Sequence, residues 1–457
     1  MRASDSWLMT SMKQRQRNCE CEACKYHFKV ALSEDLLTSF LSGDVTIFAG
    51  SGISTESKRV LKYTLYESVA DELGLGPTDL SFPELMDKYC SQPNGRVKLL
   101  KMIKERFEHV DSFPELSSRA TEFHEELATL FTVRNVVTTN WDTYFEDRCK
   151  ATPFVTDPDL AFWDAGGRRV LKIHGSIANF GSIVATTADY ESCRTRLDIG
   201  LLGAVLKTIL ATQTVVFVGY SLSDADFLSI YELVKERMNF LHKQAYAVTP
   251  FEDESKKLEQ VGLIPIVTDG AHFLRQVKAH AVKEKVMLDD GLYEAASDLL
   301  GRVHAEHRRL HLKIQATDYP ALIYAAAYQD GMAHALGRAV KLRGTGEYSN
   351  AQRTHGAIHK YMEMRRARLQ ARNYEDVAYI DGYVNGLTFL MLDHKQRRVL
   401  KPPLYYMFGK EPMWSLADFT RCLKRGDTHR ASLARARRYV GRSVNPEGLE
   451  FHHPPWL

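Results

Sequence analysis

A buried strand that ends in a glycine-rich loop is the feature that most constrains the fold of this chain. Residues 45–54 read Val-Thr-Ile-Phe-Ala-Gly-Ser-Gly-Ile-Ser, an apolar run followed by residues that can begin a helix. A loop such as Gly50-Ser51-Gly52 can approach a phosphate, because glycine has no Cβ atom to block a pyrophosphate and a helix start offers unpaired N–H donors. The pattern alone also fits an ordinary strand-to-helix turn, so its meaning depends on the rest of the chain.

The change from a buried strand to small or polar residues recurs at residues 135–142, 169–176 and 214–224. The runs are short and rich in Val, Ile and Leu, as expected for strands covered on both faces of a parallel sheet. Ligands of such sheets lie outside the carboxyl ends of the strands, so the residues after each run should converge on one crevice. We therefore predict an α/β fold, a Rossmann-like doubly wound parallel sheet, with further strands at residues 244–250 and 262–269.

In this order the segments resemble the motifs of the sirtuin family, which are Gly-Ala-Gly-x-Ser, Thr-x-Asn-x-Asp, His-Gly and Gly-x-Ser. The matching residues are Gly50-Ser51-Gly52-Ile53-Ser54, Thr138-Thr139-Asn140-Trp141-Asp142, His174-Gly175 and Gly219-Tyr220-Ser221. Ser51 replaces the usual alanine, and both residues are small. The resemblance covers about residues 35–280. It implies NAD bound across the strand ends, with the nicotinamide end near Asn140 and His174.

The resemblance also implies a set of residues that contact the NAD. These are Gly50, Ser51, Gly52, Ser54, Asp142, Gly219 and Ser221, with Thr249 as a candidate contact in an adenosine-binding loop.

Asn140 and His174 are the predicted catalytic residues. Cleavage of the bond between nicotinamide and ribose creates an oxocarbenium-like centre, against which the site must hold an attacking oxygen. The amide of Asn140 can both donate and accept a hydrogen bond. His174 titrates near neutral pH and can accept a proton from a ribose hydroxyl or a water. Asp142 points the same way as Asn140 if the strand continues, where it could fix the amide or polarise the ribose region.

These residues also have purely structural interpretations. As an isolated residue, Asn140 would cap a helix that starts at Trp141, and His174 would be a half-buried histidine at a strand end. Ser221 and Asp224 would cap the helix that follows them. Because all four segments occur in the order of the family, we favour the NAD site.

Two departures separate this chain from the protein deacylases of the family. Those enzymes follow the glycine loop with Gly-Ile-Pro-Asp-Phe-Arg, whereas residues 55–60 read Thr-Glu-Ser-Lys-Arg-Val. They also carry a four-cysteine zinc module between the His-Gly and Gly-x-Ser motifs, where this chain has only Cys193. Four thiolates cannot surround a zinc ion there. Without an acyl-lysine channel, the expected reaction is attack by water, which converts NAD to nicotinamide and ADP-ribose; an NAD-dependent protein deacylase is the least favoured alternative.

The resemblance implies an NAD hydrolase of bacterial antiphage defence, which depletes cellular NAD when it is triggered. A constitutive hydrolase would poison its host, so we expect gating by homo-oligomerisation or by a defence partner, with a HerA-type ATPase as one candidate. The alternative is a binding module that senses NAD or ADP-ribose while a partner ATPase or nuclease acts. The presence of both Asn140 and His174 favours the enzyme, because a sensor does not need them.

Residues 1–34 are interpreted as an N-terminal arm. A full set of zinc ligands is offered there by Cys19, Cys21, Cys24 and His27. Their compact spacing would draw all four ligands from one short turn, so we favour a thiol-rich arm, with a structural zinc ion as the alternative. No catalytic metal is expected.

The spacing of the cysteines favours a cytoplasmic protein. Seven cysteines at irregular intervals suit a reducing compartment better than a disulfide framework. The N-terminus is polar and basic and lacks the apolar core of a secretory signal. No run approaches the ~20 apolar residues of a membrane-spanning helix, so we expect no membrane segment.

The rest of the chain is expected to form a catalytic domain over residues 35–280 and a C-terminal domain over residues 281–457. Within the catalytic domain, residues 61–134 are helical by pattern and should cap the site. The C-terminal domain is mainly helical and basic, and we expect it to sense a trigger or to direct assembly. Its aromatic tail, residues 451–457, should dock onto a surface.

Basic clusters and histidines in the C-terminal domain are interpreted as surface features. His304, His307 and His311 fall on one helical face without a visible carboxylate that would complete a metal site. The basic clusters are typical of solvated helix faces, with nucleic acid or an acidic partner as the alternative. They lie at residues 365–368, 395–398 and 435–438.

Overall fold

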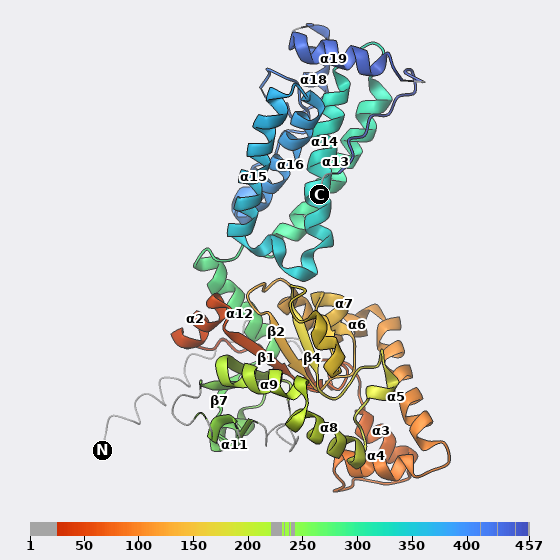
Figure 1. Cartoon of the computed structure of the whole chain (residues 1–457), viewed down its shortest axis with the longest axis vertical. Helices are drawn as coiled ribbons and strands as arrows, with labels where there is room; N and C mark the ends of the chain where they lie inside the picture. Colours follow the sequence, from red (N-terminus) through yellow and green to blue (C-terminus); the bar gives the residue numbers. More distant parts are fainter. Residues whose placement is uncertain are drawn as a thin grey trace, which may run out of the picture. The chain divides into compact units, whose positions relative to one another are not determined.

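The computed structural model describes residues 25–220 and 231–455, with residues 233, 237, 239–242, 412, 427 and 444 left out. The chain divides into two compact units, one ending at Ala281 and the other beginning at Val282. Figure 1 shows a sheet surrounded by helices in the first unit and helices that run side by side in the second. No helix of the described residues combines the length and apolar character needed to cross a bilayer.

A seven-stranded sheet forms the centre of the first unit, and every pair of neighbouring strands is parallel. The order is β3-β4-β2-β1-β5-β6-β7, so the chain builds first on one side of β1 and then crosses to the other side. This arrangement confirms the predicted doubly wound α/β fold. The strands are β1 (Val45–Ala49), β2 (Asn135–Thr138), β3 (Thr152–Phe154), β4 (Arg169–Lys172), β5 (Thr214–Val218), β6 (Ala245–Thr249) and β7 (Ile264–Val267).

Strand β3 was not predicted. It has only three residues, and one of them is Pro153, which cannot donate to a strand ladder. An edge strand tolerates proline because its outer N–H needs no partner, and β3 lies at the edge of the sheet. The short strand therefore carries no local pattern that distinguishes it from a loop.

Helices cover both faces of the sheet, because side chains along each strand alternate between the faces. Phe48 and Phe217 point to one face and pack in a core shared with α8, α9 and α11. Val218 points to the opposite face, where it meets Gly270 at the start of α12. The flanking helices are α2 (Glu34–Ser42), α7 (Tyr144–Cys149), α8 (Thr187–Ile199), α9 (Leu201–Thr212), α11 (Ser255–Gln260) and α12 (Gly270–Lys283).

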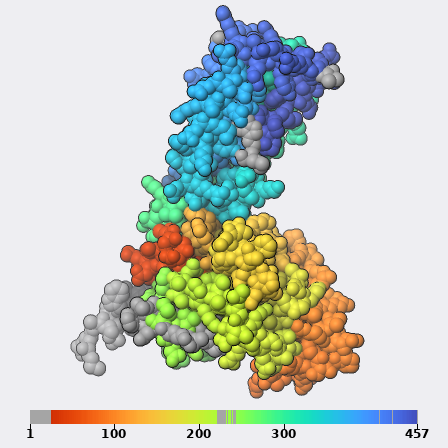
Figure 2. All heavy atoms as spheres, in the orientation of Figure 1, coloured from red at the N-terminus to blue at the C-terminus, as the bar shows by residue number. Residues whose placement is uncertain are grey.

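The segment between β1 and β2 is helical, as predicted. Its apolar core includes Trp141 and Ile177, which belong to the loops after β2 and β4. The insertion therefore packs directly on the two loops that carry Asn140 and His174. Figure 2 shows its atoms, in orange, gathered at one end of the first unit. Its helices are α3 (Leu65–Glu72), α4 (Phe82–Cys90), α5 (Gly95–Ser112) and α6 (Pro114–Ala128).

The second unit is helical, as expected for the C-terminal region. Its core runs along α14 and α16, whose backbones approach each other at Gly331 and Gly382. The helices are α13 (Gly291–Lys313), α14 (Leu322–Lys341), α15 (Ala351–Gln370), α16 (Tyr374–Met391), α17 (His394–Val399), α18 (Leu416–Lys424) and α19 (Arg430–Val440).

The interpretation of the basic clusters as solvated faces is wrong for at least one arginine in each cluster. Arg397 is 3% exposed, pairs with Asp289 and donates to the carbonyl of Leu390 (3.1 Å). The remaining two pairs join neighbouring elements: Arg365 Nε lies 2.5 Å from Asp381 Oδ1, and Arg435 Nε lies 2.7 Å from Glu375 Oε2. These arginines hold helices together, because each guanidinium offers several donors in a fixed geometry.

The interpretation of the three histidines as surface residues is correct for His304 alone. His311 is half-buried, and His307 is only 9% exposed because α14 and the C-terminal tail cover it. The expected docking of the tail is confirmed for its described residues up to 455. His453 is 5% exposed, and its ring stacks on Tyr379 with centroids 4.3 Å apart.

The described part of the N-terminal arm packs on the first unit. The His27 ring stacks on His272 of α12 with centroids 4.8 Å apart, and its Nε2 lies 4.0 Å from Asp269 Oδ1. The other candidate zinc ligands, Cys19, Cys21 and Cys24, lie outside the described residues.

Acid should destabilise the first unit through His124. This residue of α6 is fully buried, its ring packs on Phe145 with centroids 4.5 Å apart, and burial lowers its pKa from 6.5 to about 4. Between these two values the unfolded chain binds a proton that the folded chain does not. Stability therefore falls as the pH is lowered from 7 to 4, by about 3 kcal/mol from this residue.

Denaturant unfolding at several pH values measures this effect. The expected result is that His124→Phe, which keeps a ring in the core but cannot titrate, shows a smaller loss of unfolding free energy on acidification than the natural sequence. Parallel pH profiles for the two proteins would contradict the assignment.

Candidate active site

The loops that carry the four motifs meet at one edge of the sheet. The strand register pairs Ala49 with both Thr138 and Val218, and it pairs Thr138 with Lys172. The carboxyl ends of β1, β2, β4 and β5 therefore lie level, as predicted. This edge includes the point between β1 and β5 where the strand order reverses, which is where open parallel sheets bind their ligands.

Asn140, Ser54 and Asp142 form a buried hydrogen-bond chain at this edge. Asn140 Nδ2 donates to Ser54 Oγ (3.4 Å), and the Ser54 hydroxyl donates to Asp142 Oδ2 (3.0 Å). Each of the three residues is at most 4% exposed. The chain fixes the amide with its nitrogen toward Ser54, and Asn140 Oδ1 is a buried acceptor with no partner in the described protein.

The structure rules out a capping role for Asn140. Helix α7 begins at Tyr144 rather than at Trp141, and Asp142 Oδ1 accepts a hydrogen bond from the N–H of Tyr144 (3.2 Å). One carboxylate oxygen of Asp142 thus accepts a hydrogen bond at the start of α7, and the other accepts one from Ser54. The predicted influence of Asp142 on Asn140 is exerted through the Ser54 hydroxyl.

His174 follows β4 and is 4% exposed. Its carbonyl oxygen accepts a hydrogen bond from Trp141 Nε1 (3.0 Å), and its ring contacts the ring of Tyr190 edge-on with centroids 5.0 Å apart. Because β2 and β4 are neighbours, the Trp141 contact ties the loop of Asn140 to the loop of His174. The structure therefore brings the two predicted catalytic residues onto adjacent, connected loops.

The glycine loop differs from the expected one in its hydrogen bonds. It forms a short 3₁₀ turn (Ser51–Ile53) instead of an α-helix start. The N–H of Gly50 donates to β5, and the N–H of Gly52 donates to the carbonyl of Gly219 (2.9 Å). A Cβ atom at Gly50 would lie 2.4 Å from that same carbonyl oxygen. Glycine is thus required because the loops after β1 and β5 touch, and these two N–H groups are not free donors.

A buried ion pair supports the loop after β2, and the sequence analysis missed it. Lys172 is fully buried, its Nζ lies 2.9 Å from Glu146 Oε1, and it donates to the backbone carbonyl of Asp142. Burial raises the pKa of Glu146 despite the opposing charge of Lys172. The available signal was a lysine within an apolar strand, because a charge in a buried strand requires a partner.

The remaining predicted contacts lie around the same edge. Thr249 ends β6, its hydroxyl donates to Glu254, and its Oγ1 accepts from the N–H of Phe251 (3.2 Å). Ser51 and Gly52 are exposed at the tip of the glycine loop. The predicted residue Ser221, like Asp224, lies outside the described residues.

The region in which deacylases carry a zinc module is occupied by α8 and α9. Cys193 is buried on α8, and its Sγ donates to the carbonyl of Ile173 (3.3 Å). Both helices contribute apolar side chains to the core that covers the sheet. The segment therefore has a packing role in this chain.

The parallel sheet, its switch point and the motif loops at one edge define a Rossmann-like domain. Residues 134–266 match the model of the SIR2-like domain family. A chain from a structural study of the mechanism and regulation of Sir2 enzymes aligns with 55% of this chain and 97% of its own length, at 12% identity and a TM-score of 0.27.

Several proteins are similar to the first unit. The NAD(+) hydrolase ThsA of Cytobacillus dafuensis is 28% identical over 221 residues, which are 46% of this chain and 42% of that protein. Defense-associated sirtuin 2 of Bacillus subtilis is 23% identical over 239 residues, which are 49% of this chain and 23% of that protein. The NAD(+) hydrolase ThsA of Bacillus cereus (strain MSX-D12) is 24% identical over 229 residues, which are 48% of this chain and 46% of that protein. The similarity thus spans less than half of each relative.

Proposed function

We propose that this chain hydrolyses NAD to nicotinamide and ADP-ribose. The observation that carries the proposal is the buried, unpartnered Oδ1 of Asn140 at the switch point of the sheet, beside the loop of His174. A buried acceptor without a donor costs free energy, and a ribose hydroxyl or a water molecule in the site would supply the missing donor.

The hydrogen-bond chain gives Asn140 a defined role. The Ser54 hydroxyl donates its hydrogen bond to Asp142. Its oxygen lone pairs therefore accept the hydrogen bond from the amide nitrogen of Asn140. The amide oxygen is then directed to the substrate side, where it holds the attacking water against C1′ of the nicotinamide ribose. A water molecule that is held in position does not have to meet C1′ by diffusion. Its fixed position and orientation lower the activation barrier of the attack.

His174 acts as the general base in this proposal. The imidazole takes a proton from the water or from a ribose hydroxyl as the C1′–O bond forms and the C1′–N bond to nicotinamide breaks. The rest of the NAD lies along the strand ends. The proposed contacts are Gly50, Ser51, Gly52, Ser54, Asp142, Gly219, Ser221 and Thr249.

We further propose that the reaction depletes NAD during antiphage defence in the cytoplasm. The relatives named NAD(+) hydrolase ThsA and defense-associated sirtuin support this role. Because uncontrolled hydrolysis would harm the host, homo-oligomerisation or a partner such as a HerA-type ATPase would gate the site, with the helical second unit as the sensing or assembly part.

Incubation of the purified chain with NAD tests the reaction. The expected result is release of nicotinamide and ADP-ribose in equal amounts, measured by liquid chromatography. The ADP-ribose should carry one ¹⁸O atom when the reaction is run in H₂¹⁸O. Because a closed gate would also leave the purified chain inactive, the assay is repeated in extracts of phage-infected cells that carry the chain. Tight binding of NAD without turnover under both conditions would contradict hydrolysis and favour a sensor.

A further inference from the structure

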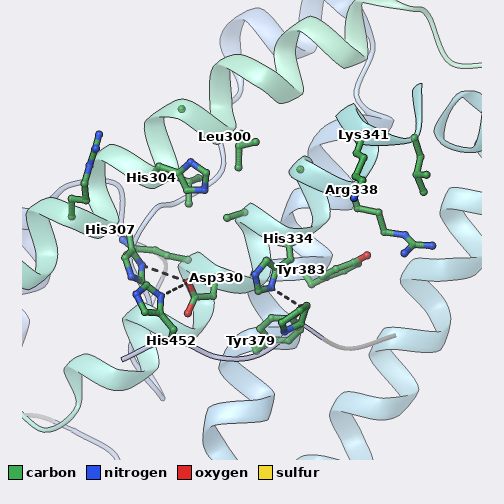
Figure 3. A pocket seen from close by; sticks show the side chains of 18 residues that line it. Leu300, His304, His307, Asp330, His334, Arg338, Lys341, Tyr379, Tyr383 and His452 are labelled. Carbon is green, nitrogen blue, oxygen red and sulfur yellow. Dashed lines mark hydrogen bonds and ion pairs between the residues drawn. The ribbon is translucent and has the colours of Figure 1, made fainter. Parts of the chain in front are cut away.

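Two histidines and an aspartate of the second unit gather at the wall of a cavity of about 1070 Å³. His307 comes from α13, Asp330 from α14, and His452 from the tail that follows α19. One ligand atom from each residue lies within 4.8 Å of the others. The rings of His307 and His452 stack with centroids 4.8 Å apart, and Figure 3 shows the Asp330 carboxylate beside both imidazoles.

His307 is buried without a hydrogen bond. It is 9% exposed, and neither ring nitrogen has a hydrogen-bond partner, although the Gln329 side chain lies beside it and its Oε1 is also unpartnered. Because neither ring nitrogen takes part in a hydrogen bond, the imidazole has ligand atoms available for a metal ion.

Asp330 is oriented by the tail. Its Oδ2 accepts a hydrogen bond from the backbone N–H of His453 (2.7 Å), and this contact leaves Oδ1 facing the two imidazoles. Oδ1 lies 3.9 Å from His307 Nδ1 and 3.4 Å from His452 Nδ1. The first distance is too long for a hydrogen bond, whereas both are close to the separation of two ligands on one metal ion.

We propose that His307, Asp330 and His452 bind one divalent transition-metal ion of the zinc class. Two imidazoles and one carboxylate form a donor set typical of zinc sites with an open position. Bonds of about 2.1 Å in a tetrahedral site place ligand atoms about 3.4 Å apart. His452 is the most accessible of the three ligands, because its side chain is 60% exposed on the tail.

The surroundings favour an open coordination position that faces the cavity. Among the described residues that line the cavity, Asp330 is the sole carboxylate, so the negative charge of this wall is concentrated at the proposed metal site. Arg338 and Lys341 line the cavity farther along, as Figure 3 shows. An oxyanion bound at the open position would be favoured by these cations, and His311, whose ring is 4.8 Å from His307, is a candidate fourth ligand in its absence.

The metal would also join the tail to two helices. His307 and Asp330 lie on the packed helices α13 and α14, whereas His452 belongs to a segment without regular structure. A metal bond across these elements stabilises the folded state by the free energy of binding. Metal removal should therefore lower the melting temperature of the second unit.

Titration of the full chain with Co²⁺, after treatment with a chelator, tests the proposal. Substitutions Cys19→Ser, Cys21→Ser and Cys24→Ser in one background protein remove the competing thiol cluster. The expected result is about one bound Co²⁺ per chain, with visible d–d absorption and no thiolate charge-transfer band. His307→Gln and His452→Gln should each weaken binding by tenfold or more.

His304→Gln is the matched control. His304 is exposed, lies on α13 three residues before His307 and lines the same cavity, so its variant should bind Co²⁺ like the background protein. His307→Gln could reduce metal binding by disturbing the core. His452→Gln tests the site without that effect, because the His452 side chain is largely exposed. Absence of saturable Co²⁺ and Zn²⁺ binding, or equal affinity in all three variants, would overturn the proposal.

Discussion

Asn140→Ala and His174→Ala are each expected to lower the rate of nicotinamide release by about 10²–10⁴-fold. Asn140→Ala removes the amide oxygen that would hold the attacking water, and His174→Ala removes the base that would accept its proton. The two side chains act on one step, so the double variant should be little slower than the more damaged single variant. Initial rates of NAD consumption at saturating NAD measure the effect.

Conservative variants separate chemistry from folding. Asn140→Ser and His174→Gln add no buried charge and should also lose most of the activity while the chain stays folded. His109→Ala replaces an exposed histidine of α5 and should leave the rate unchanged. A rate within threefold of the natural sequence for either alanine variant would remove that residue from the proposed mechanism.

Gly382→Ala is expected to destabilise the second unit by about 2 kcal/mol or more. Helices α14 and α16 touch through their backbones. A Cβ atom at Gly382 would lie 1.8 Å from the carbonyl oxygen of Tyr328, and a Cβ atom at Gly331 would lie 2.0 Å from that of Tyr379. Because the obstacle is backbone in the core of the unit, the helices must separate to admit even one methyl group.

Gly356→Ala is the matched comparison, because Gly356 lies within α15 and a Cβ atom there meets nothing within 4 Å. The same substitution should raise the unfolding free energy by about 0.5–1 kcal/mol, since alanine loses less backbone entropy in a helix. Chemical unfolding followed by circular dichroism measures both changes. Equal stabilities for the two variants would show that the close approach of α14 and α16 is not required.

The strands of the sheet could be predicted because their signals are local. Apolar runs that end in small or polar residues mark β1, β2, β4 and β5, and parallel pairing then places their ends at one edge. The short strand β3, with its proline, gives no such signal. The hydrogen bonds of the glycine loop also escaped prediction, because they depend on the contact between Gly52 and Gly219, which follow the neighbouring strands β1 and β5.

The cluster in the second unit could not be predicted for a different reason. His307 has the helical spacing of a surface residue, and the carboxylate that accompanies it lies on the next helix. His452 lies 122 residues beyond Asp330, so no local pattern links them. At the proposed active site, the motifs placed Asn140 and His174 close together, but the Ser54 bridge from Asn140 to Asp142 required coordinates.

The most direct test of the central claim is cellular NAD during phage challenge, in cells that carry either the natural sequence or Asn140→Ala. Phages against which the natural sequence protects are chosen first. We expect NAD to collapse on infection in the protected cells, with neither collapse nor protection for Asn140→Ala. Protection by the natural sequence with constant NAD would contradict the proposal that this chain is an NAD-depleting hydrolase.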